Sequence, residues 1–105
     1  MPRTRAKVDG NQAAIVQALR NAGCSVQPLH QLGHGIPDLL VATPSGETLL
    51  VEVKAAKGSL TPDQVQWIAR WQGRVEVIRD PDEIARLLGE LAGVLRFNPE
   101  KCPPA

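Results

Sequence analysis

Residues 37–54 of this chain read PDLLVATPSGETLLVEVK, and this stretch decides the fold. Two mostly apolar runs, at 39–42 and 47–51, flank the turn-forming residues 43–46. Apolar runs separated by Thr, Pro, Ser and Gly are typical of a β-hairpin. We therefore predict two antiparallel strands joined by a tight turn, with charged residues at the open end of the hairpin.

The register of this hairpin decides whether its charged residues meet. Side chains alternate between the two faces of a strand, so a slip of one residue would send Glu52 and Lys54 to the face opposite Asp38. Pairing Asp38 with Glu52 requires Thr43 to pair with Glu47, which leaves a three-residue loop whose last residue is a glycine. Such a loop is a common hairpin connection when its glycine adopts positive φ. We therefore predict that the three charged residues share one face, with opposed Cβ atoms about 5 Å apart.

Two carboxylates and an amine are costly to hold on a sheet of Leu and Val. Paired carboxylates repel each other and lose hydration, and a divalent cation relieves both costs. Mg²⁺ prefers oxygen ligands, and a bound ion of this kind can activate water for attack on a phosphodiester. Lys54 would then orient that water or neutralise the oxyanion. The alternative is an exposed charged cluster on the solvated face of the hairpin, because charged residues mostly lie in solvent.

Three segments of the chain together resemble a known nuclease core. They read GHGIPDLLV at 33–41, LVEVK at 50–54 and LTPDQ at 60–64. In this order they resemble the PD-(D/E)XK nuclease superfamily, and above all the small phage-type VRR-NUC nucleases, which are similar to archaeal Holliday-junction resolvases. An isolated Pro-Asp or Glu-x-Lys is common by chance, whereas this combination is specific. The resemblance covers roughly residues 9–84 and implies a restriction-endonuclease-like α/β core.

The resemblance also implies a role for each matching residue. Asp38 and Glu52 match the metal-binding carboxylates of the family, and the backbone carbonyl of Val53 matches a further metal ligand. Lys54 matches the catalytic lysine, and Gln64 matches a glutamine that positions water or phosphate. The implied cofactor is Mg²⁺ or Mn²⁺, with no organic cofactor, and the implied substrate is DNA.

One position departs from the family pattern. Many members carry a glutamate on the first helix, where the best-placed residue here is Gln12. A neutral amide adds no negative charge, so a second metal ion is disfavoured. Gln12 and Gln64 also have a structural explanation, since each lies three residues after a helix-capping residue, Asp9 or Thr61, which is the spacing of a capping box. The two roles are compatible, because the start of a helix favours phosphate.

The remaining sequence predicts one α/β domain with element order αβββαβα. We expect a mixed four-stranded sheet flanked by helices, with helices over 9–23, 61–73 and 80–95, and outer strands over 24–32 and 74–79. A flexible basic arm over 1–8 precedes the nuclease domain over 9–95, and a Pro-rich tail follows over 96–105. With 105 residues and 43% hydrophobic content, one domain with a modest core is expected.

Targeting signals are not recognisable in the sequence. It has no run of eighteen apolar residues and no apolar segment near its N-terminus, so we expect a cytoplasmic protein of a bacterial or phage-infected cell, without membrane contact. Cys24 and Cys102 match no metal-binding pattern, which favours reduced thiols.

DNA contacts must come from local charge, because the net charge is only +1. Arg3, Arg5 and Lys7 form a basic arm suited to phosphate contact, although a merely solubilising terminus is the alternative. Lys57, just after the hairpin, is a further expected DNA contact. His34 lies between two glycines ahead of Pro-Asp, where it either contacts phosphate or is an ordinary surface histidine.

The predicted function is therefore metal-dependent hydrolysis of DNA by an endonuclease, and the preference for linear, branched or Holliday-junction DNA is left open. Symmetric cutting of a junction needs two active sites, which predicts a homodimer. The apolar face of the third helix, and Trp67 or Trp71, are the expected adhesive surfaces; core packing and base stacking are the alternatives for the tryptophans. The rival function is a DNA-binding or assembly module whose catalysis has lapsed. A different nucleotide hydrolase is disfavoured because no glycine-rich phosphate loop is present.

Overall fold

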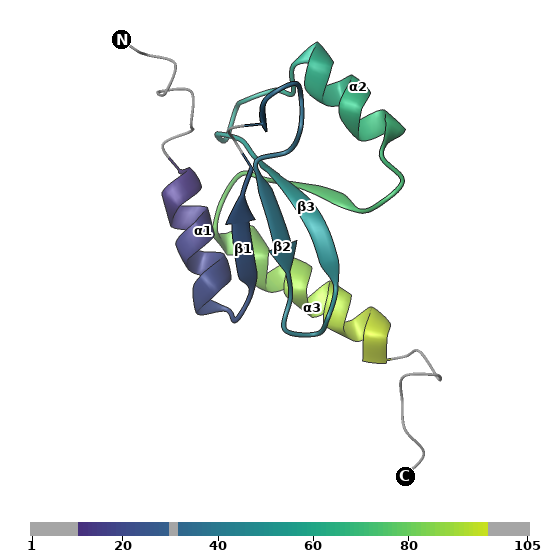
Figure 1. Cartoon of the computed structure of the whole chain (residues 1–105). Helices are drawn as coiled ribbons and strands as arrows, with labels where there is room; N and C mark the ends of the chain where they lie inside the picture. The colour runs from purple at the N-terminus through teal and green to yellow at the C-terminus, as the bar shows by residue number, and fades with distance from the viewer. Residues whose placement is uncertain (1–10, 30–31, 97–105) are drawn as a thin grey trace.

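The computed structural model describes residues 11–29 and 32–96. The predicted basic arm with Arg3, Arg5 and Lys7 lies outside the described residues, as does the tail from residue 97. The described elements follow the predicted order αβββαβα (Figure 1). They are α1 (Gln12–Asn21), β1 (Ser25–Pro28), β2 (Leu39–Ala42), β3 (Thr48–Val53), α2 (Pro62–Arg70), β4 (Val75–Ile78) and α3 (Asp82–Arg96).

The four strands form one mixed sheet with the order β1-β2-β3-β4, as predicted. The pairs β1/β2 and β2/β3 are antiparallel, and β3/β4 is parallel because α2 carries the chain back to the start of the sheet. The carboxyl ends of β3 and β4 therefore lie side by side at one end of the sheet, where ligands of α/β proteins commonly bind.

The predicted hairpin register is confirmed. Leu39 pairs with Val51, and this register continues to the Thr43 N–H, which donates to the Glu47 carbonyl at 2.8 Å. Gly46 closes the three-residue loop with φ of 93°, a conformation that a residue without Cβ adopts at little cost. The same register places position 38 opposite position 52.

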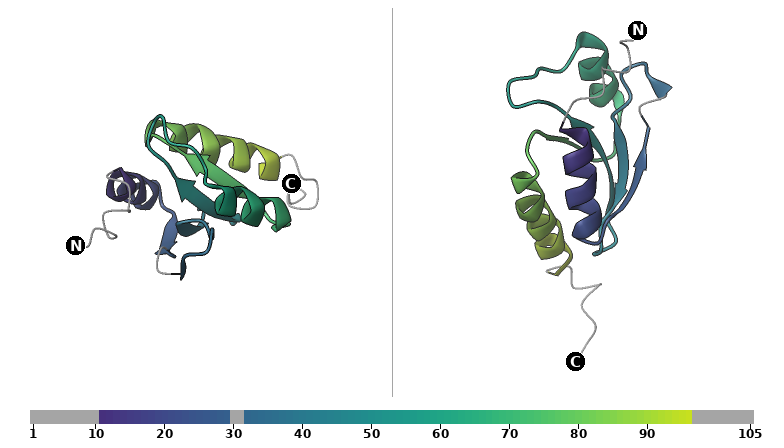
Figure 2. Two further views of the ribbon diagram at one scale, coloured as in Figure 1. Left: turned by 90° about the horizontal axis from the view of Figure 1, so that it is seen from above. Right: turned by 90° about the vertical axis from the view of Figure 1, so that its left-hand side faces the viewer.

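The hydrophobic core lies between one face of the sheet and helices α1 and α3, which Figure 2 shows on the same side. Alternate residues of the hairpin are buried in it: Leu39, Val41, Leu49, Val51 and Val53. Helix α3 adds Ile84, Leu87 and Leu91, all at most 7% exposed. Our expectation that the apolar face of α3 is an adhesive surface is therefore wrong, because the sheet already covers these side chains.

Three predicted boundaries need correction. Helix α1 begins at Gln12 with Asn11 as its N-cap, so Gln12 is the first helical residue rather than the fourth. Asp9, the predicted capping partner of Gln12, lies outside the described residues. Strand β1 covers only Ser25–Pro28, because its partner β2 begins only at Leu39. Helix α2 ends at Arg70 rather than at residue 73.

Helix α2 differs from the other two helices because none of its residues is buried. It stands beyond the ends of the strands, away from α1 and α3 (Figures 1 and 2). Its N-terminus has the predicted capping box between Thr61 and Gln64, and Pro62 occupies the first helical position. None of the described helices combines the length and apolar character that crossing a membrane requires.

Candidate active site

The predicted carboxylates lie at the open end of the hairpin, on the face of the sheet opposite the core. Asp38 immediately precedes β2, and its carboxylate Oδ2 accepts a hydrogen bond from the Val53 N–H at 2.8 Å. The Asp38 carbonyl accepts from the Leu29 N–H at 2.6 Å. Asp38 is thus fixed to the ends of both neighbouring strands. Glu52 lies within β3 and is only 2% exposed.

The Glu52 carboxylate is held through one of its two oxygens. Oε2 accepts a hydrogen bond from Nε2 of Gln64 at 2.9 Å and lies 3.6 Å from Nζ of Lys54. Oε1 is buried and has no hydrogen-bond partner in the described part of the chain. A bare buried carboxylate oxygen is costly, and a cation or a donor from a bound ligand would satisfy it.

The side-chain amide of Gln64 bonds to the helix N-terminus through its oxygen and to the Glu52 carboxylate through its nitrogen. Its Oε1 accepts from the Thr61 N–H at 2.9 Å, while the Thr61 hydroxyl accepts from the Gln64 N–H at 3.2 Å. Its Nε2 donates to Glu52. The structural and functional explanations of this glutamine therefore hold together, and the capping box orients the amide toward the site.

Burial is the main cause that raises the pKa of Glu52, from an ordinary value of 4.5 to about 7. The negative charge of the neighbouring Asp38 carboxylate raises this pKa further, and the ammonium of Lys54 opposes both effects. The ionised form of Glu52 is therefore disfavoured by its surroundings. A carboxylate in this condition gains most from a bound cation.

The Val53 peptide offers a further oxygen at the same place. Continuing the hairpin register by two residues puts Pro37 opposite Val53. A proline has no N–H, so it cannot donate to the Val53 carbonyl as the ladder would require. The Pro-Asp dipeptide thus ends the ladder beside Glu52 and leaves this carbonyl without a strand partner.

The glycine-rich lead-in to Asp38 packs against the start of α2. Gly33, His34 and Gly35 all have positive φ, at 62°, 59° and 83°. A Cβ on Gly35 would come within 2.6 Å of the Asp63 carbonyl oxygen, so only glycine allows this approach. The loop therefore holds the first turn of α2, and with it Gln64, in place. His34 itself is exposed.

Two other predicted residues are not joined to Glu52. Gln12 is buried in the first turn of α1, at 7% exposure, and no hydrogen bond connects it to Glu52 in the described structure. Lys57 is exposed on the loop between β3 and α2. No group of three or more His, Cys, Asp or Glu side chains that could hold a metal ion occurs within 11–29 and 32–92. The site thus has two carboxylates and a carbonyl, a donor set suited to one hard cation.

Sequence reasoning missed Asn11. Its Nδ2 donates to the carbonyls of Lys54 and Arg79, at 3.1 and 3.0 Å. The only local signal is an Asn just before an apolar periodic segment, which predicts a helix cap. Its side chain does not cap α1, and the two partners lie 43 and 68 positions away in the sequence.

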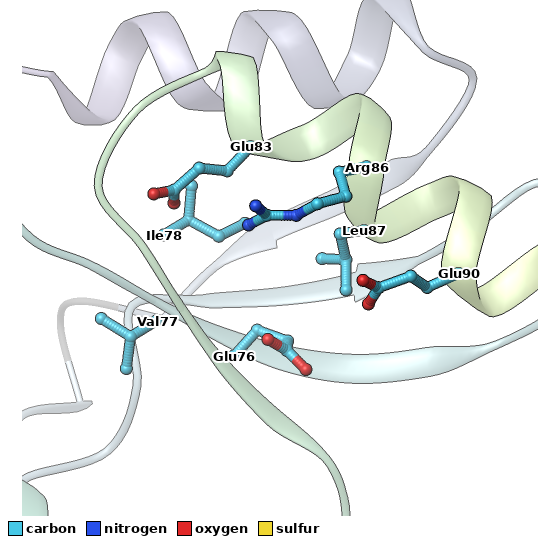
Figure 3. Close-up of a pocket in the computed structure, with 7 residues that line it drawn as sticks. All are labelled: Glu76, Val77, Ile78, Glu83, Arg86, Leu87 and Glu90. Carbon is cyan, nitrogen blue, oxygen red and sulfur yellow. The ribbon is translucent and has the colours of Figure 1, made fainter.

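A second group of carboxylates surrounds a cavity of about 230 Å³ between β4 and α3 (Figure 3). Glu76, Glu83 and Glu90 line it together with Arg86. Glu76 already bonds to Arg74 at 2.7 Å, and Glu83 accepts from the Arg79 N–H at 2.8 Å. Glu76 and Glu83 thus have partners within the fold, and among the described residues these carboxylates do not make a group that could hold a metal ion.

This α/β core, with Pro-Asp and Glu-x-Lys converging at the open end of the central hairpin, defines a member of the PD-(D/E)XK nuclease superfamily. The family model of the VRR-NUC domain matches residues 4–79, and the chain belongs to this family of nucleases. A solved structure described as a VRR_NUC domain has a TM-score of 0.63 and 23% identity, covering 77% of this chain and 97% of that one. That likeness shows the shared fold. Comparison with curated proteins gives no match.

Proposed function

We propose that this chain is a metal-dependent DNA endonuclease that hydrolyses phosphodiester bonds. The observation that carries the proposal is the state of Glu52. It is buried beside Asp38, it is held by Lys54 and Gln64 through one oxygen, and its other oxygen has no hydrogen-bond partner among the described residues. Burying such an oxygen weakens the fold, and a bound cation would offset that cost.

Asp38, Glu52 and the Val53 carbonyl would hold Mg²⁺ or Mn²⁺. When bound, the ion would lower the pKa of a coordinated water and offset charge on the phosphate. Lys54, whose ammonium lies 3.6 Å from Glu52, supplies positive charge for the developing oxyanion and a donor to orient the attacking water. Gln64 keeps the Glu52 carboxylate in one orientation, because its own amide is fixed by the capping box.

A DNA-binding or assembly module that has lost its catalytic activity is the weaker alternative. In a protein that only binds DNA, the buried carboxylate of Glu52, whose pKa is raised, would weaken the fold and serve no purpose. An apolar residue at this position would stabilise the sheet. The ion pair with Lys54 and the bond to Gln64 both orient a charged Glu52. The arrangement therefore favours a working site.

The test is cleavage of linear, nicked, flapped and four-way-junction DNA by the purified chain with Mg²⁺, with Mn²⁺ or with a chelator. We expect cutting only with metal, and none by Asp38→Asn or Glu52→Gln. Glu47→Gln is the matched control, because Glu47 lies at the far end of the same hairpin. Equal cutting by the wild type and both site variants would refute the proposal. The DNA form that is cut fastest identifies the substrate.

We further propose that the chain works as a homodimer joined through α2. A groove of about 390 Å³, lined almost wholly by carbon, lies between α2, the glycine-rich loop and the outer face of the hairpin. Leu32, Leu40 and Trp71 line it and are 55%, 40% and 48% exposed. Trp67 stacks on Trp71 with ring centroids 4.8 Å apart, so the pair forms one rigid apolar wall.

The charges of α2 favour a second copy as the occupant. The helix carries Asp63 in its first turn and Arg70 in its last. Two copies of α2 packed antiparallel about a two-fold axis would place Asp63 of each opposite Arg70 of the other. The groove then closes on an apolar surface, and the two sites take up a fixed separation suited to paired cuts.

A further inference from the structure

The side chain of Asn11 does not cap helix α1, although its position at the N-cap predicts that it would. An Asn at the N-cap ordinarily accepts a hydrogen bond from an N–H of the first helical turn. Asn11 makes no such bond to α1. Its amide instead reaches the carbonyls of Lys54 and Arg79, the residues that immediately follow β3 and β4. The Asn11 side chain therefore makes two long-range bonds in place of a helix cap.

The orientation of this amide is determined by its partners. Both contacts are to carbonyl oxygens, so only the NH₂ end fits there, and the amide oxygen must point elsewhere. That oxygen, Oδ1, is buried and has no hydrogen-bond partner in the described part of the chain. Asn11 thus breaks two local rules at once, a pattern typical of functional sites.

The two carbonyls mark the point where the β3/β4 ladder ends. The last rung is the Lys54 N–H, which donates to the Ile78 carbonyl at 3.1 Å. Asn11 then bonds the next carbonyl on each strand, so it holds the strand ends together where the backbone ladder no longer does. The Lys54 side chain leaves the backbone within this clamped peptide.

Arg79 extends the same clamp to the loop that leads into α2. Its guanidinium donates to the Gly58 carbonyl at 2.9 Å, and its N–H donates to the Glu83 carboxylate at 2.8 Å. The loop is therefore bonded to the end of β4 at Gly58, which lies between Lys54 and Gln64 in the sequence. Asn11 lies at the junction of α1, both strand ends and this loop.

We propose that Asn11 is a positioning residue for Lys54. Its amide fixes the Lys54 carbonyl, and so the direction in which the Lys54 side chain projects toward Glu52. The inference rests on the proposed nuclease function, because Lys54 acts there as the cationic group. Asn11 itself touches no reacting atom.

The decisive experiment is a double-mutant cycle on the full chain. We expect Asn11→Ala to lower kcat by about 10- to 100-fold, with KM for DNA unchanged. In a Lys54→Ala background the same change should lower kcat by less than about twofold, because the group that Asn11 positions is already gone. Losses that multiply in the double variant would overturn the proposal. Asn21→Ala is the control, since Asn21 is exposed on the same helix and its side chain accepts from its neighbour Gln17.

A second measurement does not depend on cleavage. Removal of both Asn11 bonds should speed amide hydrogen exchange at Lys54 by about tenfold, while Asn21→Ala leaves it unchanged. Asn11→Ser guards against unfolding, because serine is a good helix cap but is too short to bridge both carbonyls. If amide hydrogen exchange at Lys54 is unchanged in folded Asn11 variants, the proposal that Asn11 positions Lys54 is overturned. If wild type cuts no DNA with any metal, the nuclease proposal fails, and the exchange rates still decide whether Asn11 holds Lys54.

Discussion

Glu52 is the residue on which stability and function conflict most directly. A buried carboxylate next to a second carboxylate weakens the metal-free fold whenever it is ionised. The ammonium of Lys54 relieves that cost only in part, since the pKa of Glu52 remains raised. The metal-free protein should therefore behave differently from the metal-loaded one, and the difference should depend on pH.

We predict that the metal-free chain loses stability as pH rises from about 4.5 to about 7. The folded state holds the Glu52 proton more tightly than the unfolded state does, so the stabilisation is complete below the lower pKa and is lost through the higher one. The expected loss from this group is about 3 kcal/mol, and its contribution to stability is constant above this window. Urea unfolding at pH 5 and pH 8 in chelator measures it.

Glu52→Gln should remove this pH dependence and make the metal-free protein more stable at pH 8. Added Mg²⁺ should stabilise wild type at pH 8 and leave Glu52→Gln nearly unaffected, because binding requires the ionised carboxylate. Glu47→Gln should behave as wild type in both respects. A wild-type stability that rises between pH 5 and pH 7 would show that Glu52 is not the group in control.

At the scale of elements, the first turn of α2 joins helix formation to the site. Thr61→Ala and Gln64→Ala each break the capping box and should each cost about 1 kcal/mol of stability. Only Gln64→Ala also removes the donor to Glu52. We therefore predict that Thr61→Ala keeps most of the cleavage activity, whereas Gln64→Ala lowers kcat by about 10- to 100-fold. Equal activities of the two variants would show that Gln64 acts only as a helix cap.

The glycine-rich loop permits a similar comparison. Gly33→Ala and Gly35→Ala both place a Cβ on a residue with positive φ, which should cost each about 1 kcal/mol. The new Cβ on Gly33 meets no atom of the described residues within 4 Å, whereas the one on Gly35 would meet the Asp63 carbonyl. We predict that Gly35→Ala alone also displaces α2 and lowers cleavage. Thermal unfolding and initial cleavage rates of the two variants check this.

What the sequence predicts well here is what neighbouring residues determine. The hairpin register follows from the loop ending in Gly46, and this register alone brings Asp38 opposite Glu52. The capping box follows from the spacing of Thr61 and Gln64. Each depends on groups within fifteen residues of one another, so turn chemistry and strand alternation are enough.

What the sequence does not predict depends on packing between distant segments. The two bonds of Asn11 reach partners that lie 43 and 68 positions away in the sequence, and no local pattern predicts them. Leucines on α3 look equally suited to a core and to an interface, and only the sheet packed against α3 decides between these. The position of α2 beyond the strand ends, and hence the open groove, likewise follows from the whole fold.

At the scale of the whole molecule, we predict a homodimer at micromolar concentration. Trp71→Glu should give a monomer, because a charge in the apolar groove cannot be buried without a partner. Gln66→Glu, on the exposed surface of the same helix, is the control. Light scattering with and without junction DNA measures the state. A wild-type monomer under both conditions would exclude symmetric cutting and favour nicking or flap cleavage.

The hairpin turn at residues 44–46 lies at the end of the sheet opposite α2 (Figure 1). Pro44, Ser45 and Gly46 are all exposed, and a Cβ on Gly46 would meet no atom of the part of the chain that the structure describes within 4 Å. Exposed turns of this kind tolerate insertions. A sequence-reading module inserted at this turn would lie at the end of the sheet away from the carboxylates. The small scaffold thus has a natural attachment point at which its targeting could be reprogrammed without rebuilding its chemistry.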